Sequence, residues 1–284
     1  MQPHSLIRLT SALCGVPHLI TEAGLTPIID YLTSRNGATF DSSFIPKDKV
    51  EKQKAKQLGG IGEICIDGAL TYKPIEGMCG ATEGVSYQGI LEQAEQLISE
   101  GVTTIILTHS SPGGQADHCF ATATDLREMC DENSVKLISY VDTLSASASL
   151  AIGIVADEVI IHPSASTGSI GCVVALLDKS KALTNAGLKP IYISSTPGKV
   201  PYETDGSFSA EFLEEIQDDV TRLGKQFANH VSKYTSIPVD TVLKMDAKMF
   251  HAEAALEAGL VNKIMDHKKF TAYIAGLHKG ASSA

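Results

Sequence analysis

The chain has 284 residues, a formal net charge of −10 at pH 7 and no tryptophan. This length suits one large domain, or one domain with appendages. The negative charge argues against a nucleic-acid partner, because phosphate binding needs concentrated lysine and arginine. No apolar run approaches the length of a membrane span, and Arg8, Thr10, Ser11 and Pro17 interrupt the faintly apolar N-terminus. We therefore expect neither a membrane anchor nor a signal peptide.

The six cysteines predict neither a disulfide framework nor a metal site. None of them forms a CxxC pair, and no histidine–cysteine cluster has zinc-binding spacing. Four lie in apolar patterns and are expected to be reduced core thiols: Cys65, Cys119, Cys130 and Cys172. Reduced thiols fit a cytoplasmic protein, and no metal or cofactor is expected.

The first part of the chain differs in pattern from the rest. Residues 1–44 are expected to form a separate N-terminal segment, with a helix over Thr26–Arg35 that Thr26 caps and in which Pro27 takes the first position. Residues 45–60 form a polar, lysine-rich stretch that predicts a linker ending at Gly59 and Gly60. Residues 61–266 form the main predicted domain, and residues 267–284 a C-terminal helix or tail.

From Ile61 onward, short apolar runs alternate with helical stripes. The apolar runs are Ile61–Leu70, Thr103–Thr108, Lys136–Val141, Val159–Ile161, Cys172–Leu177, Pro190–Ser194 and Leu260–Met265. The predicted helices are Tyr87–Ile98, Ala116–Cys130, Ala148–Ala156 and a long one carrying the stripe Phe212–Val231, with Ser209 as its cap. This alternation predicts an α/β fold with a mostly parallel sheet flanked by helices. The long stripe could equally cover the sheet or face a partner.

Small residues and hydroxyls gather where the predicted strands end. The segments are Ser111–Gly114, Ser145–Ser149, Thr167–Gly171 and Gly198–Lys199. In open α/β sheets, ligands bind beyond the carboxyl ends of the strands, and glycine lets backbone amides approach a substrate closely. Each segment alone has an ordinary explanation as a turn, a packing contact or a solvated charge. Their order and common placement instead favour one site for acyl transfer.

Acyl transfer needs a nucleophile, a base and amide donors for the oxyanion. Ser147 and Lys199 are the candidate nucleophile and base. The backbone N–H groups of Gly113 and Gly114 and the N–H of Ala148, at a predicted helix start, are the candidate oxyanion donors. A lysine accepts a proton only when its amine is neutral, and burial favours the neutral form. We therefore expect Lys199 to lie against the body of the protein.

Taken together, the segments between Ile61 and Asp266 resemble the signal peptide peptidase A family of serine–lysine peptidases, in particular the branch that tailed phages use as head-maturation proteases. The matching pieces are the first strand, the Ser-Pro-Gly-Gly turn, Ala146–Ala148, Thr167–Gly171, Gly198–Lys199 and Ala255–Val261. The resemblance implies a Clp/crotonase-like fold of repeated β-β-α units. Two positions depart from the family: Ala148 stands where membrane-bound members have glycine, and Asn262 where aspartate is usual.

The family's site maps onto this chain residue by residue. Its nucleophile lies twenty residues before the threonine of the TGSIG motif, which selects Ser147 over Ser145 and Ser149. Lys199 takes the place of the base, Ser169 that of the serine that holds the lysine, and Gly114 that of the oxyanion donor. The resemblance implies a soluble, homo-oligomeric serine endopeptidase. Its partners would be capsid, scaffold or portal proteins, in the host cytoplasm or the phage prohead.

Three alternatives stay open at this point. A Clp-like peptidase would use a histidine base, for which His162 is the candidate. A crotonase-like enzyme would hold an acyl-CoA thioester with two backbone amides and would not need Ser147 or Lys199. A catalytically inactive relative would serve as an assembly protein of the same fold.

Overall fold

The computed structural model describes residues 16–22, 24–26, 55–76, 82–83 and 85–281. Apart from Thr26, the helix expected over Thr26–Arg35 lies outside these residues. Thr26 does not act as a cap, because its hydroxyl donates to the carbonyl of Glu22 (2.9 Å), as in the body of a helix.

The central layer is an eight-stranded sheet in the order β13-β12-β10-β8-β3-β2, with β11 beside β10 and β14 beside β11. Its strands are β2 (Lys56–Leu58), β3 (Ile61–Asp67), β8 (Thr104–Ser111), β10 (Lys136–Ala146), β11 (Glu158–Ile161), β12 (Ser166–Gly168), β13 (Met249–His251) and β14 (Lys263–Ile264). The inner pairs are parallel, and only β2 and β13 pair antiparallel. The sheet confirms the prediction of a mostly parallel α/β fold.

A smaller sheet lies at the carboxyl end of β8. Its order is β1-β9-β4-β7, and its strands are β1 (His18–Ile20), β4 (Leu70–Thr71), β7 (Val85–Ser86) and β9 (Gly113–Gln115). A separate hairpin joins β5 (Ile75–Glu76) to β6 (Thr82–Glu83). The predicted Ser-Pro-Gly-Gly turn therefore runs directly into a strand of this second sheet.

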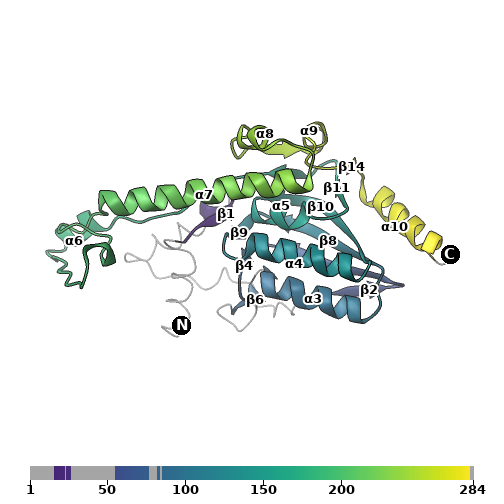
Figure 1. Ribbon diagram of the computed structural model, residues 1–284, viewed down its shortest axis with the longest axis horizontal. Helices are drawn as coiled ribbons and strands as arrows, with labels where there is room; N and C mark the ends of the chain where they lie inside the picture. Colours follow the sequence, from purple (N-terminus) through teal and green to yellow (C-terminus); the bar gives the residue numbers. More distant parts are fainter. Residues whose placement is uncertain (1–15, 23, 27–54, 77–81, 84, 282–284) are drawn as a thin grey trace.

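Helices cover both faces of the central sheet (Figure 1). The main core contains the buried faces of α3 (Tyr87–Ser99), α4 (Cys119–Glu132) and α5 (Ala148–Gly153). In α3, the buried residues recur every three or four positions, as expected of a helix with one apolar face: Tyr87, Ile90, Ala94 and Leu97. On the opposite face, Ile274 of α10 (His267–Ala281) packs with Ile106, Ile138, Tyr140 and Ile160.

A long arm projects from the body of the protein (Figure 1). It comprises residues 174–226 and includes α6 (Ser180–Asn185), the short 3-10 helix η2 (Pro197–Lys199) and most of α7 (Ala210–Tyr234). Stacked aromatic rings hold its tip together: Tyr192, Tyr202, Phe208 and Phe212. Only the last part of α7 packs on the core, where its buried residues are Phe227, Ala228, His230 and Val231. The apolar stripe predicted for this helix therefore contacts the body of the protein only at its C-terminal end. The chain then returns through α8 (Val239–Leu243) and α9 (Ala252–Glu257).

Three segments differ in the structure from what the sequence predicts. The expected linker contains a strand, since Lys56–Leu58 pairs with β3 and Gly59 and Gly60 make the turn between them. Pro190–Ser194 is not a strand but an irregular stretch of the arm, in which the side chain of Ile193 is 95% exposed. Cys172–Leu177 is also irregular, apart from a bridge between Val173 and His18. Both apolar runs look like strands in the sequence, but neither has a neighbouring strand of the central sheet.

The carboxylate of Glu158 fastens α10 to the sheet. It accepts hydrogen bonds from Lys136 Nζ (2.6 Å), Lys263 Nζ (2.6 Å) and Tyr273 OH (2.7 Å). Burial by itself would raise the pKa of Glu158, but these hydrogen bonds outweigh it and lower the pKa to about 2. The folded state therefore favours the charged carboxylate.

We predict that Glu158→Gln lowers the free energy of unfolding by about 1.5–3 kcal/mol at pH 7, the range for hydrogen bonds to charged groups. A glutamate in the unfolded chain titrates near ~4.3, and the pKa in the folded state is lower. The advantage of the wild type should thus be complete above about pH 5 and fade as the pH falls toward 2. Urea unfolding across this pH range measures it, with the exposed Glu257→Gln as control. A pH-independent difference would contradict the assignment.

Candidate active site

Ser147 occupies a strained junction between strand β10 and helix α5. Its backbone adopts φ 54° and ψ −115°, a left-handed conformation that L-residues rarely take. A nucleophile on a sharp strand-to-helix turn has the same arrangement in other hydrolases. Its N–H donates to the carbonyl of Gly168 (2.8 Å), so β12 holds the junction from one side. Such strain costs about 1–3 kcal/mol and persists only where the surroundings enforce it.

The predicted oxyanion strand lies on the other side of Ser147. An ideal Cβ built on Gly113 would lie 3.0 Å from Ser147 Cβ, and one built on Gly114 would lie 1.9 Å from the carbonyl oxygen of Leu70. Neither position has room for a side chain, which explains both glycines. Ala148, the other predicted donor, is the fully buried first residue of α5.

The hydroxyls of the three neighbouring serines differ in their partners. Ser149 Oγ lies 2.8 Å from His109 Nδ1 and 3.3 Å from Ser145 Oγ. Ser147 Oγ is buried and has no hydrogen-bond partner within the described part of the chain. Burial lowers the pKa of His109 to about 3, so its ring is neutral and a weak base. Only the Ser147 hydroxyl is therefore left uncommitted among the three.

Ser169 is adjacent to this site. It follows Gly168, which pairs with Ala146 across the β10–β12 ladder, and it is 9% exposed. Its backbone is also left-handed (φ 56°), and its N–H donates to the carbonyl of Lys248 (2.9 Å). The structure therefore brings Ser147, Ser169, Gly114 and Ala148 together.

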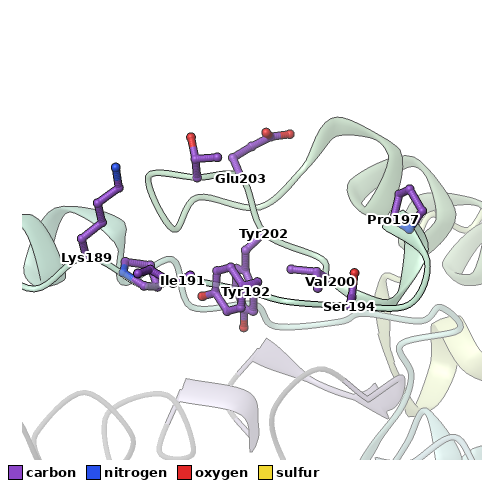
Figure 2. Close-up of a pocket in the computed structure, with 10 residues that line it drawn as sticks. Lys189, Ile191, Tyr192, Ser194, Pro197, Val200, Tyr202 and Glu203 are labelled. Carbon is purple, nitrogen blue, oxygen red and sulfur yellow. The ribbon is translucent and has the colours of Figure 1, made fainter.

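Lys199 does not join them within one chain. It lies in η2 on the arm, and its side chain is exposed. The expectation that Lys199 lies against the body of its own chain is wrong. A cavity of about 440 Å³ opens in the same part of the arm (Figure 2). Its walls include Tyr192, Pro197 and Val200 but neither Ser147 nor Ser169, so it is separate from the predicted site.

The alternative base, His162, faces away from Ser147. Its ring packs against that of His267 on α10, with centroids 4.7 Å apart, and its Nδ1 accepts from the N–H of Ser164 (3.2 Å). Among the described residues, no hydrogen bond joins His162 to the Ser147 hydroxyl. The geometry gives no support to a Ser147–His162 pair.

Two features of the site were missed by the sequence analysis. One is strand β1, which runs beside β9; a three-residue strand has no periodicity to reveal it. The other is the buried pair of His109 and Ser149. Both residues lie among apolar and hydroxyl residues, and their spacing in the sequence does not indicate that the two side chains meet.

The sequence model of Peptidase family S49 matches residues 131–279, which is more than half of the chain. The chain belongs to Peptidase family S49. The matched range contains Ser147, Ser169 and Lys199. Membership of this peptidase family confirms the predicted resemblance to the signal peptide peptidase A family.

Two of the proteins to which this S49 member is similar in sequence come from phages. It is 25% identical over 215 residues to the head-tail preconnector protein GP5 of Enterobacteria phage P21, covering 74% of this chain and 41% of that protein. It is 26% identical over 215 residues to the capsid assembly protease C of Escherichia phage lambda, covering 74% and 47%. A putative signal peptide peptidase SppA of Enterococcus faecium is 23% identical over 237 residues, covering 82% and 67%. The chain thus spans less than half the length of the two phage relatives.

Among solved structures, a mutant ClpP1 from Listeria monocytogenes is similar with a TM-score of 0.47 and 12% identity, covering 73% of this chain and 92% of that one. In the described residues, no helix is long and apolar enough to cross a membrane. Nor do three or more histidine, cysteine or acidic side chains gather there in a way that could hold a metal ion. The four cysteines that the structure describes are thiols.

We predict that Ser147→Gly is more stable than Ser147→Ala by about 1 kcal/mol, because glycine adopts a left-handed backbone without strain. The matched pair at Ser149, inside α5, should show the opposite order, since glycine costs about 1 kcal/mol relative to alanine in a helix. Thermal unfolding of the four variants gives both differences. If Ser147→Gly is no more stable than Ser147→Ala, the Ser147 junction is not strained.

Proposed function

We propose that this S49 member is a serine endopeptidase with Ser147 as nucleophile and Lys199 as general base. The observation that carries the proposal is the buried, unpartnered Ser147 hydroxyl on a strained strand-to-helix turn. Beside it runs a glycine strand with room for backbone only. They offer two of the three parts that acyl transfer to a serine requires, the nucleophile and the amide donors.

The reaction follows from this arrangement. Ser147 Oγ attacks the carbonyl carbon of a peptide bond while its proton passes to the neutral amine of Lys199. The N–H groups of Gly114 and Ala148 stabilise the oxyanion. The leaving amine takes the proton from Lys199 as the C–N bond breaks. Water then attacks the acyl-enzyme, again with Lys199 as base, and restores Ser147.

In this proposal, Lys199 comes from a second copy of the chain. The lysine is exposed on an arm that projects from the body, close in sequence to Ile191 and Ile193, which are 82% and 95% exposed. Exposed apolar side chains of this size mark an interaction surface. Docking of this arm on a neighbouring body would bury the isoleucines and bring Lys199 toward Ser147 and Ser169. The role of Ser169 would then be to hold the lysine amine.

The names of the phage relatives indicate the biological setting. One is a capsid assembly protease and another a head-tail preconnector protein. We propose that this chain cleaves capsid, scaffold or portal proteins during phage head maturation. A purely structural assembly protein would have no need for a strained serine with an uncommitted hydroxyl. The same strain argues against a crotonase-like enzyme, which would need only the two backbone amides.

We predict that Ser147→Ala abolishes peptide cleavage, whereas Ser145→Ala and Ser149→Ala keep substantial activity. Lys199→Arg should also be inactive, because a guanidinium does not give up its proton. Intact-mass measurement should show that a serine-reactive phosphonate adds one adduct to the wild type and none to Ser147→Ala. Normal turnover by Ser147→Ala would contradict the nucleophile.

We predict further that mixing two inactive variants, Ser147→Ala and Lys199→Ala, restores part of the activity. Each mixed pair would contain one intact Ser147 facing one intact Lys199. Two samples of the same variant, mixed in the same way, are the control. Wild-type activity of Lys199→Ala alone would exclude lysine as the base. A mixture that stays inactive, when both variants assemble normally, would mean that serine and lysine come from one chain.

We predict that Ile193→Asp weakens self-association at least tenfold, since it places a charge where an apolar contact is expected. Asn185→Asp, on α6 of the same arm, adds a charge at an exposed polar position and serves as control. Light scattering over a range of concentrations measures the molar mass. A monomeric wild type at all concentrations would exclude the assembly.

A further inference from the structure

Strand β1 fills a slot beside the nucleophile. It pairs antiparallel with β9, so that His18, Leu19 and Ile20 lie opposite Gln115, Gly114 and Gly113. On its other side, His18 exchanges two backbone hydrogen bonds with Val173, of 2.8 and 2.9 Å. This strand thus pairs with the predicted oxyanion strand on one side and, through His18, with the start of the arm on the other.

Further bonds fix the ends of this strand. The N–H of Ala116 donates to the carbonyl of Pro17 (3.1 Å), and the N–H of Thr21 donates to the carbonyl of Pro112 (3.0 Å). All of these are backbone contacts. They would be available to any extended peptide that took the same path, whatever its side chains.

The carbonyl of Leu19 lies near the candidate nucleophile. Because His18 directs its backbone groups to Val173, those of Leu19 point to β9, as neighbouring residues of an antiparallel strand alternate. The ideal Cβ position of Gly113 lies 2.1 Å from the Leu19 carbonyl oxygen and 3.0 Å from Ser147 Cβ. The Leu19 carbonyl and Ser147 Cβ therefore both lie close to Gly113.

Burial shows that this slot is closed to other molecules. His18 is 1% exposed, Leu19 0% and Ile20 7%, and the Leu19 side chain belongs to the main hydrophobic core. Ser147 itself is 0% exposed. A nucleophile for polypeptides must be reachable, so the segment that covers it has to leave or be replaced.

We propose that β1 is a built-in substrate mimic, and that the slot between β9 and Val173 receives a substrate peptide once β1 has left it. The occupant that fits is an extended polypeptide, antiparallel to β9, with a leucine-sized apolar side chain in the place of Leu19. This inference deepens the proposed function, since it takes Ser147 as the nucleophile of that slot. A strand of three residues forms few bonds, and exchange for another peptide with the same backbone contacts costs little.

Binding of a peptide without cleavage tests this inference. The protein is the full chain carrying Ser147→Ala. The probe is a fluorescent peptide with the sequence of residues 16–24 of this chain. Leu19→Glu in the protein should expel β1, because a carboxylate is not stable in the apolar site of Leu19. Thr26→Glu adds the same charge to an exposed position of the same segment and is the matched control.

Fluorescence anisotropy should show at least tenfold tighter probe binding to Leu19→Glu than to Thr26→Glu. A probe with glutamate in place of its own leucine should not bind either protein. Equal affinity for the two proteins, or no binding to a folded Leu19→Glu variant, would overturn the proposal. Circular dichroism melting verifies folding.

If Leu19→Glu does not fold, Leu19→Ala replaces it. This variant keeps position 19 apolar but removes most of the buried side chain. It should still bind the probe several-fold more tightly than the control does. Equal binding would again refute the substrate mimic. Because only binding is measured, a failure of catalysis in the mixing experiment would contradict the Ser147–Lys199 pair without deciding this inference.

Discussion

The left-handed backbone at Ser147 is the constraint on which the rest of the site depends. A serine does not adopt φ 54° unless its neighbours enforce it. Here strand β10 enters the junction from within the parallel sheet and α5 leaves it into the core, while Gly168 accepts the N–H of Ser147. The neighbouring strands confine the adjoining glycines. A Cβ on Gly113 would strike the backbone of Leu19, and one on Gly114 would strike the backbone of Leu70.

The position of Lys199 has a physical rationale in the proposed assembly. An ammonium group buried without a partner is costly, and a core that contained one in every free chain would be destabilised by it. On the arm, the lysine remains in water until another copy is present. Desolvation of the lysine and burial of Ile191 and Ile193 would then occur in the same event. The apolar burial offsets the cost of dehydrating the charge.

The sequence predicts well those elements whose buried residues recur at regular intervals along the chain. α3 and α4 follow their apolar stripes, β8 and β10 follow continuous apolar runs, and Ser209 caps α7 as expected. The site residues of the body could be located for a related reason. Small residues after buried strands all face the same edge of a parallel sheet, so their proximity follows from the topology.

Other features depend on contacts that a linear pattern does not encode. The stretch Pro190–Ser194 has the composition of a strand, yet it lies on the arm with exposed isoleucines, because its apolar residues do not face the core of the same chain. β2 is a polar stretch that becomes a strand only because the edge of β3 is open to it. β1 is too short for periodicity, and only the three-dimensional fold reveals that its partners are β9 and Val173.

Val173 connects the arm to strand β1. It lies at the base of the arm, and it forms both backbone hydrogen bonds on the outer side of β1. Any displacement of the arm that draws Val173 away from His18 removes these two bonds from β1. A pull on the arm by a neighbouring copy would therefore loosen the strand that covers Ser147. In the proposed assembly, the arrival of Lys199 at a neighbouring site would thus be coupled to the opening of the slot on the chain that supplies it.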